Sequence, residues 1–96
     1  MPAFFIANVN VKNLEKFQQY GQQAAASMQP FEGQLLTKGA LAKNLAGDLN
    51  YQSVAIVTFP DQAKLDAWFE SDNYQALIQI RDEAADMLLT SFNTPS

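Results

Sequence analysis

The chain has 96 residues, of which 48% are hydrophobic and 17% are charged, and its formal net charge at pH 7 is −4. This length predicts one domain, residues 1–96, with a thin hydrophobic core. The six Lys and Arg residues are scattered, so no basic stripe follows a phosphate backbone and nucleic-acid binding is not expected. A run of about 18 apolar residues and a signal-peptide pattern are both missing, so we expect a cytoplasmic protein that does not span a membrane.

The sequence contains neither Cys nor His. Without Cys, it has no disulfide, no thiolate nucleophile and no sulfur ligand for zinc or iron. Without His, it lacks the commonest general base and the usual protein ligand of haem and zinc. We therefore expect no metal and no cofactor.

Residues 3–11 are predicted to form a strand that is apolar on both faces, since Phe4 and Ile6 alternate with Phe5 and Ala7. A half-exposed strand is apolar on one face only, so two apolar faces indicate burial from both sides. The next segment is predicted to be a helix capped by Asn13 and ended by Pro30. Its apolar stripe consists of Leu14, Phe17, Gly21, Ala24 and Met28.

Residues 33–41 and 52–59 are predicted to be two further strands, joined by the polar connection 42–50. In the first of them, Leu36 and Lys38 are expected on one face, with Leu35 and Thr37 on the other. The second is again apolar on both faces.

Asp61 is the predicted N-cap of a helix that follows these strands, and Ser71 is predicted to cap another helix that begins at Asp72. Residues 87–92 are predicted to form the last strand. The resulting order is β-α-β-β-α-β, with the second helical region broken into two. This order predicts an α+β, ferredoxin-like fold, in which a four-stranded antiparallel sheet carries its helices on one face.

Helices on one face leave the apolar side chains of the other face exposed to water, among them Phe4, Ile6, Val54 and Ile56. Burying each of them is worth roughly 1.5–3 kcal/mol. Such a patch exceeds what monomers tolerate, so the sequence predicts a homodimer in which two sheets pack face to face.

Several short strings resemble those of one known family. They are Met1-Pro2-Ala3-Phe4-Phe5-Ile6-Ala7-Asn8, Phe59-Pro60, Ala67-Trp68-Phe69, Ser71, Tyr74-Gln75-Ala76, and Arg81 with Ala84-Ala85. In this order and spacing they resemble the DUF1330 family of small bacterial proteins, in the dimeric α/β-barrel superfamily, over roughly Pro2 to Phe92. The resemblance implies a ferredoxin-like protomer and a barrel formed by two sheets. It implies no reaction, because none is assigned to the family.

The chain departs from the family pattern at four places. Members usually carry Arg-Gly-Gly where this chain has Lys38-Gly39-Ala40, and Asp72 stands where the family has Pro. Ala46 and Thr58 stand where members commonly carry Glu. Two carboxylates that would serve as acid or base are therefore missing, which weakens the expectation of proton-transfer chemistry.

Three functional hypotheses follow. The first is binding of a small organic molecule in a mostly apolar pocket between sheet and helices. The second is a cofactor-independent enzyme, of the monooxygenase or isomerase type, in which Lys38 or Arg81 stabilises an oxyanion. The third is that the candidate residues only pack the dimer. The predicted polar and aromatic lining consists of Asn8, Lys38, Thr58, Trp68, Tyr74 and Arg81.

Each candidate also has a structural interpretation. The amide of Asn8 would hydrogen-bond either backbone or ligand. Lys38 would anchor an anion in a pocket between the sheets or extend into solvent near the strand end. Trp68 and Tyr74 would anchor the core or line a cavity, and Arg81 would hold a carboxylate ligand or pair with a neighbouring acid.

Overall fold

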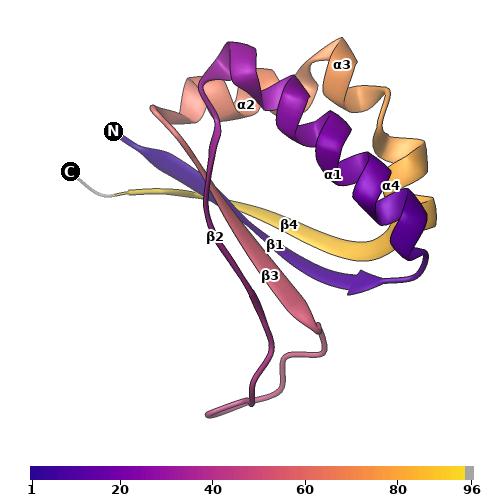
Figure 1. Cartoon of the computed structure of the whole chain (residues 1–96). Helices are drawn as coiled ribbons and strands as arrows, with labels where there is room; N and C mark the ends of the chain where they lie inside the picture. Colours follow the sequence, from indigo (N-terminus) through magenta and orange to yellow (C-terminus); the bar gives the residue numbers. More distant parts are fainter. Residues whose placement is uncertain (95–96) are drawn as a thin grey trace.

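The computed structural model describes residues 1–94, and the last two residues of the predicted domain lie outside this range. Its four strands form one antiparallel sheet in the order β2-β3-β1-β4, and the helices cover one face of the sheet (Figure 1). This is the architecture predicted from the sequence. The elements are β1 (Ala3–Val11), α1 (Leu14–Met28), the 3-10 helix η1 (Gln29–Phe31), β2 (Gln34–Ala40), β3 (Ser53–Phe59), α2 (Gln62–Glu70), α3 (Asp72–Gln75), α4 (Ile78–Ala84) and β4 (Ala85–Asn93).

Side chains cap the helices as predicted. The Asn13 carboxamide oxygen accepts a hydrogen bond of 3.0 Å from a backbone N–H in the first turn of α1. Asp61 accepts one of 2.8 Å at the start of α2. Ser71 accepts from the N–H of Tyr74 at 3.2 Å and donates to the carbonyl of Trp68 at 2.7 Å. One serine therefore ends α2 and begins α3.

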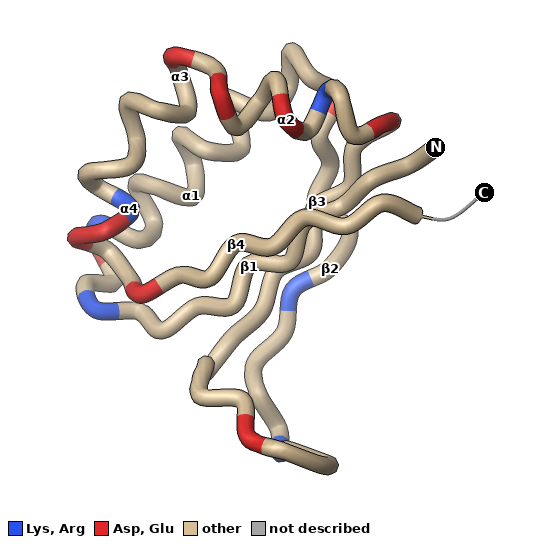
Figure 2. The backbone as a smooth tube through the Cα atoms, turned by 180° about the vertical axis from the view of Figure 1, so that it is seen from behind, with Lys and Arg blue, Asp and Glu red and all other residues tan. Residues whose placement is uncertain are grey.

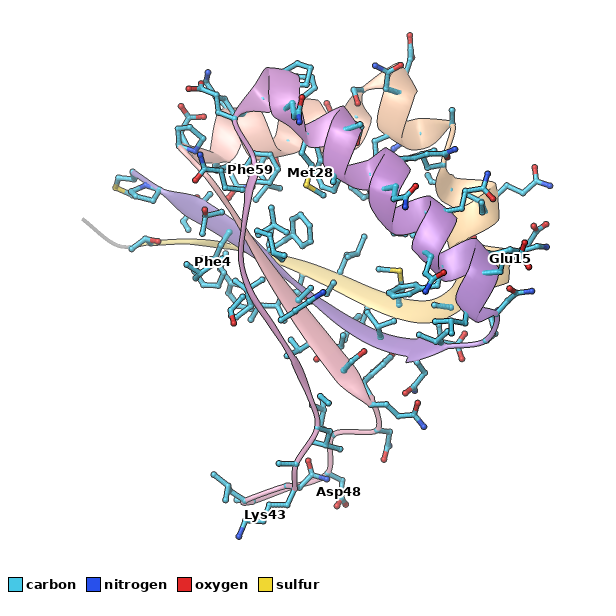
Figure 3. The ribbon with its side chains drawn as sticks, viewed as in Figure 1. Phe4, Glu15, Met28, Lys43, Asp48 and Phe59 are labelled. Atoms are coloured by element: carbon cyan, nitrogen blue, oxygen red, sulfur yellow. The ribbon has the colours of Figure 1, made fainter. Side chains whose placement is uncertain are left out.

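The two faces of the sheet differ in what covers them. On central strand β1, Phe5, Ala7 and Val9 are buried against the helices. Figure 3 shows Phe59 in the layer between sheet and helices, whereas Phe4 lies on the other side of the sheet. Strand pleating explains this, because successive side chains point to opposite faces.

The face without helices is apolar. Ile6 pairs with Ile56 of β3, and the rings of Phe4 and Phe92 stack with centroids 5.3 Å apart. Strand β4 adds Leu88, which is exposed. The strands carry few charged residues (Figure 2). We call this surface the open face.

Strand β2 differs from its prediction. A bulge between Leu35 and Thr37 shifts the register, so that Leu35 pairs with Val57 and Lys38 pairs with Ala55. Both partners pack on the helix side of the sheet. The predicted alternation, which placed Leu35 and Lys38 on opposite faces, is therefore wrong, because one extra residue reverses the pattern.

The start of the last strand and the number of helices in the second helical region also differ from the prediction. The final strand begins at Ala85 rather than at residue 87. The second helical region has three pieces rather than two, because the N–H of Leu77 bonds the carbonyl of Tyr74 at 2.8 Å and tightens the turn between α3 and α4. Within residues 1–94, no helix is both long enough and apolar enough to cross a membrane.

The connection between β2 and β3 projects away from the helices (Figure 1). Its tip carries Lys43 and Asp48 (Figure 3), and Leu45 there is 88% exposed. We call residues 41–52 the arm. The predicted polar connection is thus confirmed as an irregular segment, although three exposed leucines make it less polar than expected. They are Leu41, Leu45 and Leu49.

Candidate functional site

A pocket of about 190 Å³ opens between helix α2 and edge strand β4. Its inner wall includes Phe5 of β1 and Trp68 of α2, whose rings stack with centroids 5.1 Å apart and planes 6° apart. The strand supplies aliphatic and hydroxyl groups, and the helix adds an exposed aromatic ring and two carboxylates. The lining residues are Phe5, Leu65, Asp66, Trp68, Phe69, Glu70, Leu89, Thr90 and Ser91.

Trp68 connects this pocket to the protein interior. Its side chain is almost fully buried, and its indole N–H donates a hydrogen bond of 2.9 Å to the hydroxyl of Ser27 on α1. On another side its ring packs against Tyr74, with centroids 4.4 Å apart. A ligand in the pocket would therefore contact a ring that Ser27 of α1 and Tyr74 of α3 hold in place.

Behind Trp68 lies a cluster of two tyrosines and an arginine. The hydroxyls of Tyr20 and Tyr74 are 2.8 Å apart, and the guanidinium Nη1 of Arg81 donates to the Tyr74 oxygen at 3.1 Å. The Arg81 Nε also donates to Asp82 at 3.3 Å. Tyr74 has no exposed surface, so the hydrogen-bond partners of its phenolic oxygen are the side chains of Tyr20 and Arg81.

Two groups of the cluster, Tyr20 and Arg81, have shifted pKa values. Burial, followed by the influence of Tyr74, raises the pKa of Tyr20 well above its usual range. Burial opposes the charge of Arg81, but the hydrogen bonds and charge interactions with Tyr74 and Asp82 together more than offset it, and the pKa of Arg81 is raised. Such a guanidinium is suited to stabilise negative charge on an oxygen near Tyr74.

The six residues predicted to line a site do not converge. Trp68, Tyr74 and Arg81 come together on the helix side of the sheet, and of the six only Trp68 lines the pocket. Asn8 pairs with Val54 of β3 and Leu88 of β4 on the open face. Thr58 lies on the same face, where it pairs with Phe4 of β1, and its hydroxyl donates to a β2 carbonyl at 3.4 Å.

Lys38 stands apart from all of them. It lies on β2, at the sheet edge opposite β4, and is exposed. The bulge turns it to the helix side, so the structure favours the second of its two interpretations, a side chain that extends into solvent, over a place in a pocket between two sheets. Arg81 lies on α4, which packs against α1 and β4, so the two cations do not form a joint oxyanion site within one protomer.

Sequence reasoning missed most of the pocket lining. The lining comes from β1, α2 and β4, and apolar residues such as Phe5 and Leu89 are also what a core requires, so their types carry no functional signal. One signal was available on α2. Asp66 and Glu70 are four residues apart and therefore lie on one side of the helix, next to the exposed ring of Phe69.

A second cavity, of about 220 Å³, lies at the base of the arm. Its lining is almost wholly apolar and includes none of the six candidate residues. It is formed by Ala40, Leu41, Ala42, Leu49, Tyr51, Ser53 and Val54. Among the described residues, no group of three or more acidic side chains is placed to hold a metal ion. The pocket beside α2 is therefore the better candidate site.

The family model for the domain of unknown function DUF1330 matches residues 2–93. The chain belongs to the DUF1330 family. The resemblance inferred from the short sequence strings is thereby confirmed. A search of the curated proteins finds no match to this DUF1330 chain.

Solved structures resemble this DUF1330 protein closely in fold. The RPA0582 protein of Rhodopseudomonas palustris, of unknown function, superposes with a TM-score of 0.81 at 18% identity, covering 99% of this chain and 83% of its own. SnoaB, a cofactor-independent oxygenase of Streptomyces nogalater, gives 0.71 at 12% identity, covering 99% and 94%. A dimeric ferredoxin-like protein of unknown function from Thermobifida fusca gives 0.64 at 17% identity, covering 98% and 92%. At these identities the likeness establishes the ferredoxin-like fold.

Proposed function

We propose that this DUF1330 protein is a homodimer that binds a small organic molecule in the pocket between α2 and β4. The observation that carries the proposal is the make-up of that pocket. Aromatic rings from two elements stack in its lining, and a few polar side chains complete that lining. Sites for small organic molecules typically combine a mostly apolar wall with a small number of polar groups that orient the ligand.

The open face supports the dimer. It presents Ile6, Ile56 and the stacked pair Phe4 and Phe92, which no helix of the protomer covers. Apolar patches of this kind on soluble proteins mark association surfaces. A face-to-face pair of sheets would bury the patch on both copies through one two-fold axis. The Thermobifida fusca protein of the same fold is dimeric.

Trp68 provides the test, because it is the only tryptophan in the chain and it lines the pocket. Titration with a panel of small aromatic and aliphatic metabolites should change the Trp68 fluorescence and raise the melting temperature for at least one ligand class. Ser91 pairs with Phe5 in the sheet, so Ser91→Met should fill the pocket and abolish both effects. Thr94→Met, outside the lining, should preserve them. A panel without any response would contradict the proposal.

A second candidate is a cofactor-independent enzyme of the monooxygenase or isomerase type. It is favoured by the contact of Arg81 with Tyr74, which places a cation beside a phenolic oxygen, and by the fold shared with SnoaB. Since Lys38 lies at the far edge of the sheet, Arg81 would stabilise the oxyanion in this scheme. Turnover of a candidate substrate should disappear in Arg81→Met and Tyr74→Phe, with circular dichroism unchanged. Turnover that survives both substitutions would exclude this candidate.

A further inference from the structure

The pocket between α2 and β4 carries charge of one sign only. Asp66 and Glu70 are its charged lining residues, and both are carboxylates. They belong to successive turns of α2, a helix that Figure 2 shows carrying acidic positions at this end of the molecule. We infer that the pocket takes an organic cation, an amine whose apolar body lies against the aromatic rings and whose ammonium group faces Asp66 and Glu70. This inference rests on the proposed function and names its ligand class.

The two carboxylates have free capacity to accept hydrogen bonds. Asp66 accepts one, of 2.8 Å, from the side chain of Gln62 on the preceding turn. A carboxylate has about four lone-pair sites, so Asp66 retains room for an ammonium donor. An ammonium group carries three N–H donors and suits two such neighbours at once.

The helix backbone adds to the negative potential. The pocket lies along the second half of α2, from Leu65 to Glu70, where the helix ends and its carbonyl groups carry partial negative charge. No basic residue occupies the last turn to offset this charge. Lys64, earlier on the same helix, is paired with Glu32. A carboxylate ligand would therefore be repelled in this pocket, whereas an amine would be attracted.

The aromatic wall suits a cation as well as an apolar group. Phe69 is 38% exposed, and its ring is steeply inclined to that of Trp68, with centroids 6.1 Å apart and planes 68° apart. Ring faces attract a cation placed within about 6 Å. The exposed ring of Phe69 thus adds to the attraction of the carboxylates, and the hydroxyl of Ser91, which pairs with Phe5 on the helix side of the sheet, offers a polar contact on the strand side.

Three ligands of similar size and different charge separate this inference from general binding. Fluorescence of Trp68 in the full-length protein is titrated at pH 7 with 2-phenylethylamine, 2-phenylethanol and 3-phenylpropionate. We expect the amine to bind about tenfold more tightly than the alcohol, and the carboxylate to bind more weakly than both. The preference for the amine should shrink as salt is added, because the carboxylates are near the surface.

Variants locate the effect in the pocket. Asp66→Asn and Glu70→Gln should each weaken amine binding about threefold and leave alcohol binding unchanged, since each removes one charge at constant shape. Asp72→Asn, which removes an acidic residue of α3 outside the lining, is the matched control and should change neither.

The outcomes distinguish a preference for amines from the binding of any small organic molecule in this pocket. Binding of the alcohol or the carboxylate with no preference for the amine would overturn the inference and leave the proposed binding function standing. An amine preference that persists in Asp66→Asn and Glu70→Gln would also overturn it, by placing the cation elsewhere. Absence of any response to all three ligands would count against both the ligand class and this pocket as a site.

Discussion

The indole Nε1 of Trp68 lies 2.9 Å from the hydroxyl oxygen of Ser27, and that hydroxyl in turn donates to the carbonyl of Ala24 at 2.6 Å. Both side chains are buried, Trp68 at 1% exposure and Ser27 at 7%. The Ser27 hydroxyl therefore accepts a hydrogen bond from the only polar atom of the Trp68 side chain and donates its own proton to a backbone carbonyl of α1. The hydrogen bond fixes α2 against α1, and so fixes the inner wall of the pocket.

Ser27→Ala should destabilise the fold by about 1–3 kcal/mol, because it leaves the buried indole N–H without an acceptor. Urea denaturation followed by circular dichroism measures this free energy of unfolding. The exposed Ser91 offers a matched control, and Ser91→Ala should change stability by less than about 0.5 kcal/mol. Equal stabilities of the two variants would show that the Trp68 hydrogen bond contributes little.

Alkaline pH should destabilise the protein through Tyr20. Burial raises the pKa of this phenol in the folded state, whereas the unfolded chain ionises near the usual tyrosine value of about 10. A raised folded-state pKa contributes stability that is complete below pH 10 and is lost as the pH rises above it. The free energy of unfolding should therefore fall above pH 10 by up to about 1.4 kcal/mol per pH unit.

Tyr20→Phe removes that titration, so its unfolding free energy should fall less steeply above pH 10 than that of the wild type. Tyr51, which lies in the arm, provides the comparison: Tyr51→Phe should keep the wild-type slope. Urea denaturation at several pH values between 8 and about 11 gives the slopes. Identical slopes for all three proteins would mean that Tyr20 ionises as freely in the folded state as in the unfolded chain.

Two glycines should respond to alanine in opposite directions. A Cβ atom at Gly33 would lie 2.8 Å from the ring of Phe59 and 3.0 Å from the Cβ of Met28, so Gly33→Ala should cost about 1–3 kcal/mol. At Gly21, within α1, a Cβ would meet nothing within 4 Å. Gly21→Ala should therefore stabilise by about 0.5–1 kcal/mol. Thermal unfolding of both variants tests the pair, and a stabilised Gly33→Ala would refute the close contact with Phe59.

A charge at the centre of the open face should prevent dimerisation. Ile56 pairs with Ile6 there, so Ile56→Lys should convert the proposed dimer into a folded monomer, with a dissociation constant raised at least a hundredfold. Sedimentation equilibrium measures the constant. Gln22→Lys, on the exposed side of α1, is the control and should leave the dimer intact. A dimer that survives Ile56→Lys would place the interface elsewhere.

Much of the fold was predictable because local signals and the overall topology agree. Asn13, Asp61 and Ser71 cap helices where capping chemistry requires them, and the apolar residues of β1 on one face are buried against the helices. Burial of its other face belongs to the proposed dimer. The bulge before Lys38 was not predictable, since an extra residue in a strand depends on its pairing with β3 and leaves no mark in the alternation of residue types.

The site was less predictable than the fold. Trp68 was anticipated, but the residues that define the pocket with it, such as Phe5 and Leu89, come from distant strands and share their residue types with the core. Polar residues drew attention instead, and Asn8 and Thr58 proved to lie on the other face of the sheet. Which polar residues converge is decided by strand register, and register is a tertiary property.

Strand β1 carries side chains of the pocket on one face and side chains of the open face on the other. Phe5 contributes to the pocket, whereas its neighbours Phe4 and Ile6 point to the surface proposed to meet a second copy. A ligand that displaces this strand acts on both surfaces through the same backbone. Thermodynamic linkage then makes the effect reciprocal: the factor by which the ligand changes dimer affinity is the factor by which dimerisation changes affinity for the ligand.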